Sequence, residues 1–227
     1  MLEQNLNCFQ PVKNYVFIGE AGCGKSELAV NLAFRLKAQG KTVQFFDMDQ
    51  TKPLFRSRDL KDELDAADIA LHYVEQFQDE PVLVGGVREQ LSGPDSCVLD
   101  VGGDDIGSRA VGGFSALINQ PSTAVYFILN PFRPWSRTLA DIDGTLSAIL
   151  QISHIEKFHV ICNPNFGFKT TVEEALEGIR QAEEHLEGRV GMDFISVRED
   201  IAAEVAAQTP YSVFPMHLYL TYPWDRT

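Results

Sequence analysis

The sequence has little of what places a protein in a membrane or on nucleic acid. No stretch approaches the roughly 20 consecutive apolar residues that span a bilayer, and the opening residues MLEQNLNCFQ have neither the basic start nor the apolar run of a secretion signal. Lys and Arg number 19 against 32 Asp and Glu, a formal net charge of −13, which disfavours attraction to a phosphate backbone or an anionic membrane. We therefore expect a cytoplasmic protein that binds neither nucleic acid nor membranes.

Metal-binding patterns of cysteine and histidine are also missing. The four cysteines, Cys8, Cys23, Cys97 and Cys162, are far apart and show no C-x-x-C pair or zinc-type spacing. The five histidines show no H-E-x-x-H motif and no paired spacing of ligands on a helix. We interpret the thiols as reduced and mostly as core residues.

Short apolar runs that end in Gly, Asp or Asn alternate with segments of helical period, a pattern typical of βα units around a mainly parallel sheet. The segments predicted as strands are Tyr15–Gly19, Val43–Asp47, Cys97–Val101, Ala124–Asn130, Phe158–Asn163 and Asp193–Val197. We expect an α/β fold with helices on both faces of the sheet, as one domain over residues 1–227 with a short aromatic appendage from about Tyr211. The segment 53–96 shows no clear period, and switch elements are one interpretation of it.

Three helices are predicted from period and capping. Leucine recurs every fourth residue from Leu28 to Leu36, and Gly40 follows as a helix stop. A second helix over 171–186 opens with Thr-Val-Glu-Glu, which matches the capping-box pattern. A third covers roughly 201–207 and ends before a proline.

The strongest motif lies between the first predicted strand and the first predicted helix. Residues Gly19–Ser26 fit G-x-x-x-x-G-K-[ST], in which glycines let backbone N–H groups surround phosphates at a helix N-terminus. In such a loop Lys25 neutralises the β- and γ-phosphates, for binding and for catalysis, and the Ser26 hydroxyl ligates Mg²⁺. The residues expected to contact nucleotide here are Gly19, Glu20, Ala21, Gly22, Cys23, Gly24, Lys25, Ser26 and Glu27.

Carboxylates at two later strand ends supply what phosphoryl transfer needs beyond this loop, namely groups that hold Mg²⁺ and position water. Asp47 and Asp49 form a D-x-D pattern at the end of the second strand, and Asp100 begins Asp-Val-Gly-Gly at the end of the third. An Asp at a strand end can also merely cap a turn, but the phosphate loop upstream favours catalysis. Gly103 has no side chain, so its backbone can approach a γ-phosphate and donate an N–H.

These motifs in this order resemble the MinD, ParA and CobQ/CobB-like branch of P-loop proteins, often called the SIMIBI class. The resemblance covers about residues 15–211. It implies that the first switch holds the D-x-D motif, that the second holds a D-x-G-G-like motif, and that an Asn after a later strand reads the base. The matching residues are Asp47, Asp49, Asp100, Gly103 and Asn163.

The resemblance also implies roles for single residues. Asp49 would position or activate water and would bind Mg²⁺ with Ser26, while Asp47 and Asp100 would support the Mg²⁺ shell. Asn163 would meet the purine edge. The family's last strand-to-helix connection borders the base, which implies a nucleotide contact up to Pro210.

The chain departs from this family at Glu20, where MinD and ParA carry a signature lysine that reaches the partner's phosphates in a dimer. A carboxylate there repels phosphate, so we expect a monomer or a dimer that does not depend on nucleotide. A client protein could supply the missing cation in trans. Within the chain, the candidate cations are Lys52, Arg56, Arg58, Arg133 and Arg137.

Base identity is indicated by Asn163-Pro-Asn-Phe166. GTPases of the class usually show Asn-Lys-x-Asp, whose carboxylate pairs with guanine, and Phe166 replaces that carboxylate. The sequence therefore favours ATP over GTP as the nucleotide.

We interpret the protein as an ATP-binding and ATP-hydrolysing switch that acts as an accessory or maturation factor for a client protein. Two alternatives remain open at this stage. One is a small-molecule kinase or ligase of the dethiobiotin-synthetase kind, and the other is a nucleotide-binding regulator without hydrolysis.

Overall fold

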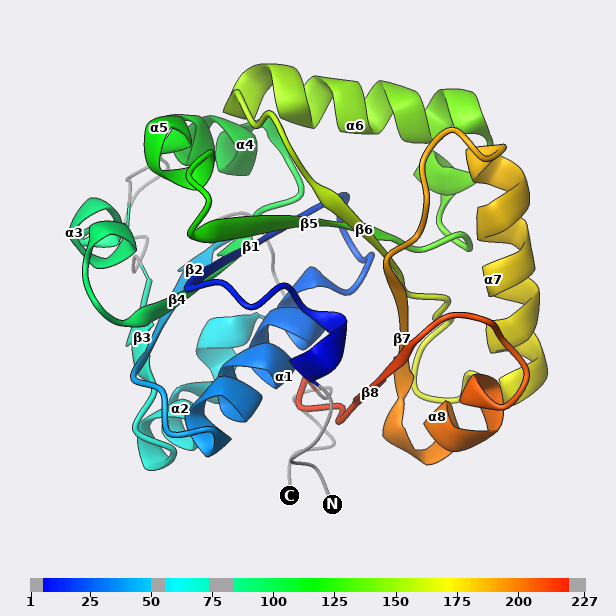
Figure 1. Cartoon of the computed structure of the whole chain (residues 1–227), viewed down its shortest axis with the longest axis horizontal. Coiled ribbons are helices and arrows are strands. Elements are labelled where there is room, and N and C mark those ends of the chain that lie inside the picture. Colours follow the sequence, from blue (N-terminus) through cyan, green and yellow to red (C-terminus); the bar gives the residue numbers. More distant parts are fainter. Residues whose placement is uncertain (1–5, 50–55, 74–83, 221–227) are drawn as a thin grey trace.

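The strands pair in parallel into one sheet (Figure 1). The computed structural model describes residues 6–49, 56–73 and 84–220, and its eight strands follow the order β3-β2-β4-β1-β5-β6-β7-β8. Their bounds are β1 Asn14–Ile18, β2 Val43–Met48, β3 Ala70–His72, β4 Ser96–Val101, β5 Thr123–Leu129, β6 His159–Cys162, β7 Phe194–Arg198 and β8 Val213–Met216. The predicted α/β fold with a parallel sheet is confirmed.

Helices cover both faces of this sheet (Figure 1). Their bounds are α1 Lys25–Ala38, α2 Lys61–Ala66, α3 Val87–Ser92, α4 Asp105–Gly112, α5 Ser115–Ile118, α6 Leu139–Ser153, α7 Val172–Leu186 and α8 Glu199–Ala206. Short 3-10 turns are η1 Leu6–Cys8, η2 Ser57–Leu60 and η3 Pro134–Ser136. In the described part of the chain, no helix combines the length and the apolar character that crossing a membrane requires.

The central strand β1 divides the core into two layers. Val16 and Ile18 belong to the apolar cluster that packs under α3 to α8, whereas Tyr15 and Phe17 belong to the cluster under α1 and α2. Successive strand residues point to opposite faces, and both faces are covered here. This explains why the strands of this chain read as continuous apolar runs and not as an alternation with polar residues.

Two helices form for the reasons predicted. The leucines of α1 from Leu28 to Leu36 are buried, and Gly40 follows the helix with a left-handed φ of +79°. At the start of α7, the Thr171 hydroxyl accepts a hydrogen bond from the Glu174 N–H at 3.2 Å, and the Glu174 carboxylate accepts one from the Thr171 N–H at 2.8 Å. The reciprocal capping box is present.

Several elements escape sequence-level prediction because they are short or lack a clear apolar period. They are β3, β8 and the helices α2 to α6. The chain from about Tyr211 was expected to be an appendage, but Val213–Met216 forms the edge strand β8 beside β7. Its Phe214 is fully buried and belongs to the core, whereas the end of the expected appendage, 221–227, lies outside the described residues.

The segment that follows β8 is held along one face of α1. The Asn31 side chain donates to the His217 carbonyl at 2.8 Å and accepts from the His217 N–H at 2.9 Å. One amide therefore pairs with both backbone groups of His217, much as a neighbouring strand would. The Glu27 carboxylate accepts the Tyr219 N–H at 2.6 Å and also the Leu220 N–H. These side-chain contacts bring residues 217–220 beside the start of α1, next to the phosphate loop.

Phe9 occupies the centre of an aromatic cluster on the α1 face. It is 5% exposed although it follows only the short turn η1. Its ring packs edge-to-face, with centroid distances from 4.9 to 6.3 Å, against five rings contributed by Tyr15, Phe17, Tyr126, Phe194 and Phe214. Phe9 therefore joins the N-terminal segment to strands β1, β5, β7 and β8.

We expect Phe9→Ala to lower the free energy of unfolding by about 3–5 kcal/mol, since it opens a cavity among packed rings. The matched control is Phe168→Ala, which removes a ring that is 39% exposed and should cost less than about 1 kcal/mol. Urea denaturation followed by circular dichroism measures both values. Equal losses for the two variants would contradict this account of the core.

Candidate functional site

A cavity of about 530 Å³ lies at the carboxyl edge of the sheet. Every segment that lines it follows the end of a strand, where parallel α/β sheets bind ligands. The lining residues are Ala21, Gly22, Gly24, Lys25, Ser26, Glu27, Asp49, Gly103, Asp104, Arg133, Asn163, Asn165, Phe166, Gly167, Phe168, Leu218 and Leu220. The phosphate-loop motif and the residues expected to meet the base therefore share one cavity.

The loop between β1 and α1 needs glycine for its shape. Gly19, Gly22 and Gly24 have φ values of +138°, +73° and +105°, which side-chain-bearing residues rarely adopt. A Cβ atom on Gly24 would lie 2.0 Å from the Asn163 Nδ2, so the end of β6 approaches the loop backbone directly. The glycines of the motif are therefore required for two reasons, the left-handed backbone conformation and the close approach of a neighbouring side chain.

Lys25 and Ser26 begin helix α1 and are buried against the loop, at 5% and 3% exposure. The Lys25 ammonium donates to the Glu20 carbonyl at 2.9 Å and lies 3.9 Å from the Cys23 Sγ. The side chain therefore spans the loop from its end to its beginning. Its positive charge is held where phosphate oxygens would meet the N-terminus of a helix.

The two carboxylates of the D-x-D motif have different surroundings. Asp49 lines the cavity, whereas the Asp47 side chain is 1% exposed and forms an ion pair with Arg58, whose Nε lies 2.8 Å from Oδ2. Asp47 also accepts the N–H groups of Arg58 and Asp49, both at 3.1 Å. Asp47 thus organises the segment after β2, and among the described residues it is not part of the cavity wall.

The second predicted switch lies against the phosphate loop. Asp100 is buried at the end of β4 and accepts the Ser57 hydroxyl at 2.5 Å, so it meets the first switch and not the cavity. Gly103 does line the cavity. A Cβ atom there would lie 2.6 Å from the Ala21 nitrogen, and only glycine allows this approach.

Asn163 connects the base side of the cavity to the phosphate loop. It is 1% exposed, and its Nδ2 donates to the Cys23 carbonyl at 2.8 Å. Its Oδ1 is buried and accepts no hydrogen bond from the residues that the structure describes. Beside it, the Phe166 ring stacks on Phe132 at a centroid distance of 3.8 Å and an angle of 13°.

Comparison with protein families identifies this arrangement. Residues 15–210 match the model of the CobQ/CobB/MinD/ParA nucleotide-binding domain. The chain belongs to this family. The predicted resemblance is thereby confirmed, and the protein is a nucleotide-binding P-loop domain of the MinD/ParA-like type. A search among curated proteins found no match.

Solved structures of a signal recognition particle protein and of FtsY proteins share the fold of this family member. The signal recognition particle 54 kDa protein of Aeropyrum pernix, in complex with GDP, has a TM-score of 0.50 and 16% identity over 85% of this chain and 43% of that one. The FtsY proteins of Thermotoga maritima and of Elizabethkingia anophelis, the latter with GDP, have TM-scores of 0.53 and 0.52 and identities of 13% and 12%. The match to the first covers 83% of this chain and 62% of that one. The match to the second covers 86% of this chain and 59% of that one. The chain thus spans less than two thirds of each.

Four of the residues expected to contact nucleotide do not line the cavity of this family member, namely Gly19, Glu20, Cys23 and Pro210. Pro210 precedes β8, so it lies toward the amino edge of the parallel sheet, and it is exposed. The resemblance suggested it because the family's last strand-to-helix connection borders the base, but here Pro210 lies beyond α8 and leads into β8. The Glu20 side chain turns to α6, where the Thr145 hydroxyl donates to its Oε1 at 3.3 Å; its carbonyl meets Lys25.

Three groups of lining residues were not predicted. Leu218 and Leu220 come from the segment that α1 holds after β8, and Phe168 follows Phe166 in the loop after β6. Asp104 caps α4 by accepting the Gly107 N–H at 2.9 Å. Leu218 and Leu220 belong to no local motif, and their places depend on long-range contacts with α1, which a single sequence does not display.

The donors present suit Mg²⁺. The Ser26 hydroxyl and the Asp49 carboxylate are hard oxygen ligands in one cavity, and Mg²⁺ is usually held by one or two carboxylates together with substrate phosphates. No cluster of three or more His, Cys, Asp or Glu side chains capable of holding a metal occurs in the described ranges.

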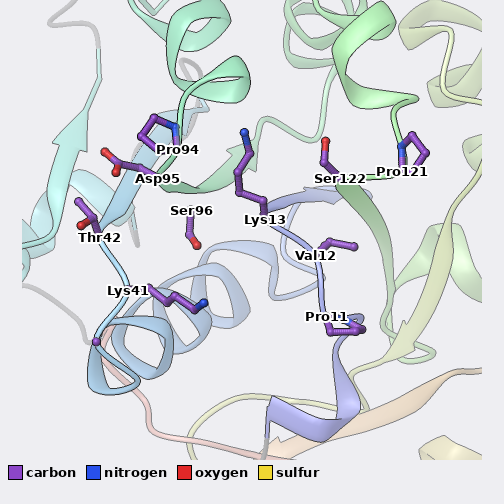
Figure 2. Close-up of a pocket in the computed structure, with 11 residues that line it drawn as sticks. Pro11, Val12, Lys13, Lys41, Thr42, Pro94, Asp95, Ser96, Pro121 and Ser122 are labelled. Carbon is purple, nitrogen blue, oxygen red and sulfur yellow. The ribbon is translucent and has the colours of Figure 1, made fainter.

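A second hollow, of about 490 Å³, lies at the opposite edge of the sheet, where strands β1, β2, β4 and β5 begin (Figure 2). The Lys13 ammonium at this hollow donates to the Leu91 and Gly93 carbonyls, at 2.8 and 2.5 Å. No residue of the phosphate-loop, switch or base motifs lines it. The turns that line this hollow, some of which contain proline, are simply the connections that lead into these four strands.

We expect Gly24→Ala to reduce nucleotide affinity by about 100-fold, because the new methyl group displaces Asn163 and the loop it contacts, and small displacements of positioning groups have effects of this size. Gly40→Ala is the control: Gly40 also has a left-handed φ, but its Cβ would meet nothing within 4 Å. Titration with a fluorescent nucleotide analogue compares the two. Undiminished affinity of Gly24→Ala would refute the close contact.

Proposed function

We propose that this protein is a Mg²⁺-dependent ATPase whose nucleotide state controls its contact with a client protein. The observation that carries the choice of ATP is the orientation of the Asn163 amide. The Cys23 backbone oxygen is an acceptor, so the group that meets it must be the Asn163 amino group. The buried Oδ1 of the same amide is then left as an acceptor without a partner among the described residues, in a residue that lines the cavity.

Such an acceptor suits adenine better than guanine. On the purine edge that carries N7, adenine adds an amino donor at N6, whereas guanine carries the acceptor O6. Guanine would place an acceptor against an acceptor and would leave Asn163 Oδ1 without a donor, which is costly for a buried group. Phe166, in place of a guanine-pairing carboxylate, adds apolar surface stacked on Phe132.

The residues around the phosphate loop support hydrolysis. Lys25 supplies a fixed positive charge, Ser26 and Asp49 supply oxygen ligands, and the Gly103 backbone lies close to Ala21. Mg²⁺, when bound, would neutralise phosphate charge and orient the reacting groups. In this proposal Asp49 orients the attacking water, while Asp47 and Asp100 act indirectly through Arg58 and Ser57.

The same contacts connect the site to a surface that a client could read. Arg58 and Ser57 join the segment before α2 to the ends of β2 and β4. The large apolar side chains that are exposed within the described residues are Ile106, Phe166 and Phe168. Phe166 and Phe168 line the nucleotide cavity, and Ile106 lies in the first turn of α4, next to Gly103 and Asp104. A client docked on them would contact the switch region directly.

ATP should compete with a fluorescent nucleotide analogue at least about tenfold better than GTP, since one buried hydrogen-bond mismatch has about that effect. The measurement is a titration with both nucleotides at constant Mg²⁺. Lys25→Ala should abolish binding of either nucleotide, because it removes the cation held inside the loop. Equal or tighter binding of GTP would contradict the role given to Asn163.

Asp49→Asn should keep ATP affinity within about threefold but lower single-turnover hydrolysis by about 100-fold, since a water-positioning group acts mainly in the transition state. Asp47→Asn is the comparison. It leaves Arg58 buried without its counter-charge and should reduce stability, by about 3 kcal/mol. Hydrolysis must be measured without an added metabolite, because turnover that requires one would indicate a kinase or ligase.

A further inference from the structure

Arg133 holds a positive charge beside the phosphate loop. Its Nε donates to the Gly22 carbonyl at 3.1 Å, and its guanidinium lines the same cavity as Lys25 and Gly103. A Cβ atom built on Gly22 would lie 3.7 to 3.9 Å from three guanidinium atoms. The guanidinium therefore packs on the loop backbone itself, 111 residues away in the sequence.

The segment that carries Arg133 is fixed from several sides. Asn130, buried at the end of β5, accepts the Phe132 N–H at 3.1 Å on its side chain and the Arg133 N–H at 3.1 Å on its carbonyl. Its Nδ2 donates to the Asn165 carbonyl at 2.8 Å. Prolines flank the turn, and Phe132 stacks on Phe166. The position of Arg133 thus follows from a rigid turn, not from a flexible arm.

Two of the other candidate cations are already paired with carboxylates. Arg58 is paired with Asp47, and Arg56 with Asp59, whose Oδ1 lies 2.7 Å from the Arg56 Nη2. Arg137 is exposed and does not line the cavity. Lys52 lies outside the described residues. The carboxylate that replaces the signature lysine, Glu20, meets Thr145.

Within the described ranges no ion pair involves Arg133. The group that holds it is a backbone carbonyl, which orients the guanidinium without neutralising it. In a chain with a formal net charge of −13, an arginine fixed in this way keeps its charge for an anionic ligand. Its fork of donors suits phosphate oxygens in particular.

We propose that Arg133 contacts the terminal phosphate of bound ATP and supplies, from within the same chain, the charge that the signature lysine supplies in relatives. The inference rests on the proposed ATPase function. Gly103, which is expected to meet the γ-phosphate, approaches Ala21, and Arg133 approaches the next residue, Gly22. Both therefore lie at the part of the loop where the terminal phosphate is expected.

The assisted step is hydrolysis of the terminal phosphate. The water oxygen forms a bond to the γ-phosphorus, and the bond to the bridging oxygen breaks with its electron pair remaining on ADP. One water proton stays on the phosphate product and the other is released to solvent. Negative charge grows on the oxygens during this step, and an arginine beside them can raise the rate by about 10³ to 10⁵ in P-loop enzymes.

The test compares Arg133→Ala and Arg133→Lys with Arg137→Ala, an exposed arginine in the same connection. For each variant, affinities for ATP and ADP and the single-turnover rate with Mg²⁺ are measured. Arg133→Ala should lose about tenfold in ATP affinity, less in ADP affinity, and at least 100-fold in rate. Arg133→Lys should recover part of the rate, and Arg137→Ala should behave as the original protein.

Two results would overturn the assignment while leaving the ATPase intact. One is an Arg133→Ala variant with ATP affinity and rate within twofold of the original. The other is an equal loss of ATP and ADP affinity with an unchanged rate, which would make Arg133 a support for the loop only. If the unsubstituted protein binds no ATP, the proposed function is refuted, and this inference with it.

Discussion

The parallel pairing of β1 with β4 on one side and β5 on the other is the constraint on which the site depends. It places the ends of the three strands side by side, so that the phosphate loop, Gly103 and the turn at Asn130 emerge at one edge. β2 adds Asp49 to the same edge and β6 adds Asn163. The close approach of Gly24 to Asn163 and of Gly103 to Ala21 then follows from strand spacing. The site is therefore a property of the sheet's register as much as of the loop's sequence.

Much of this could be predicted from the sequence because the signals are local. A phosphate loop combines a buried strand, glycines and a helix start within a few residues, and α7 shows its own capping box. The places of Leu218, Leu220 and Pro210 could not be predicted in the same way. They depend on whether the chain adds β8 to the sheet, and a strand of four residues containing a proline gives a weak signal.

The D-x-D motif does not by itself show which of its two aspartates faces the cavity. The resemblance implied that both aspartates serve the site, and two residues separated by one would point to the same side of a strand. β2, however, ends at Met48, between them. Asp47 remains in the strand and binds Arg58, while Asp49 has left the strand and lines the cavity. The end of a strand, which local patterns define poorly, thus decides which carboxylate faces the ligand.

The presence of Glu20 in place of the family's signature lysine leaves the phosphate site in need of another cation, and Arg133 is the residue that we propose for it. A lysine at position 20 would be long and mobile, and in relatives it acts across a dimer, so its benefit depends on a partner. A carboxylate there removes that cation and turns away to Thr145 of α6. The net charge of −13 makes a replacement by scattered surface cations ineffective, since nearby carboxylates neutralise them, as Asp59 does for Arg56. A cation held by a carbonyl escapes this neutralisation. That is the physical reason why we propose Arg133, which the neutral Gly22 carbonyl anchors, as the cation that replaces this lysine within a single chain.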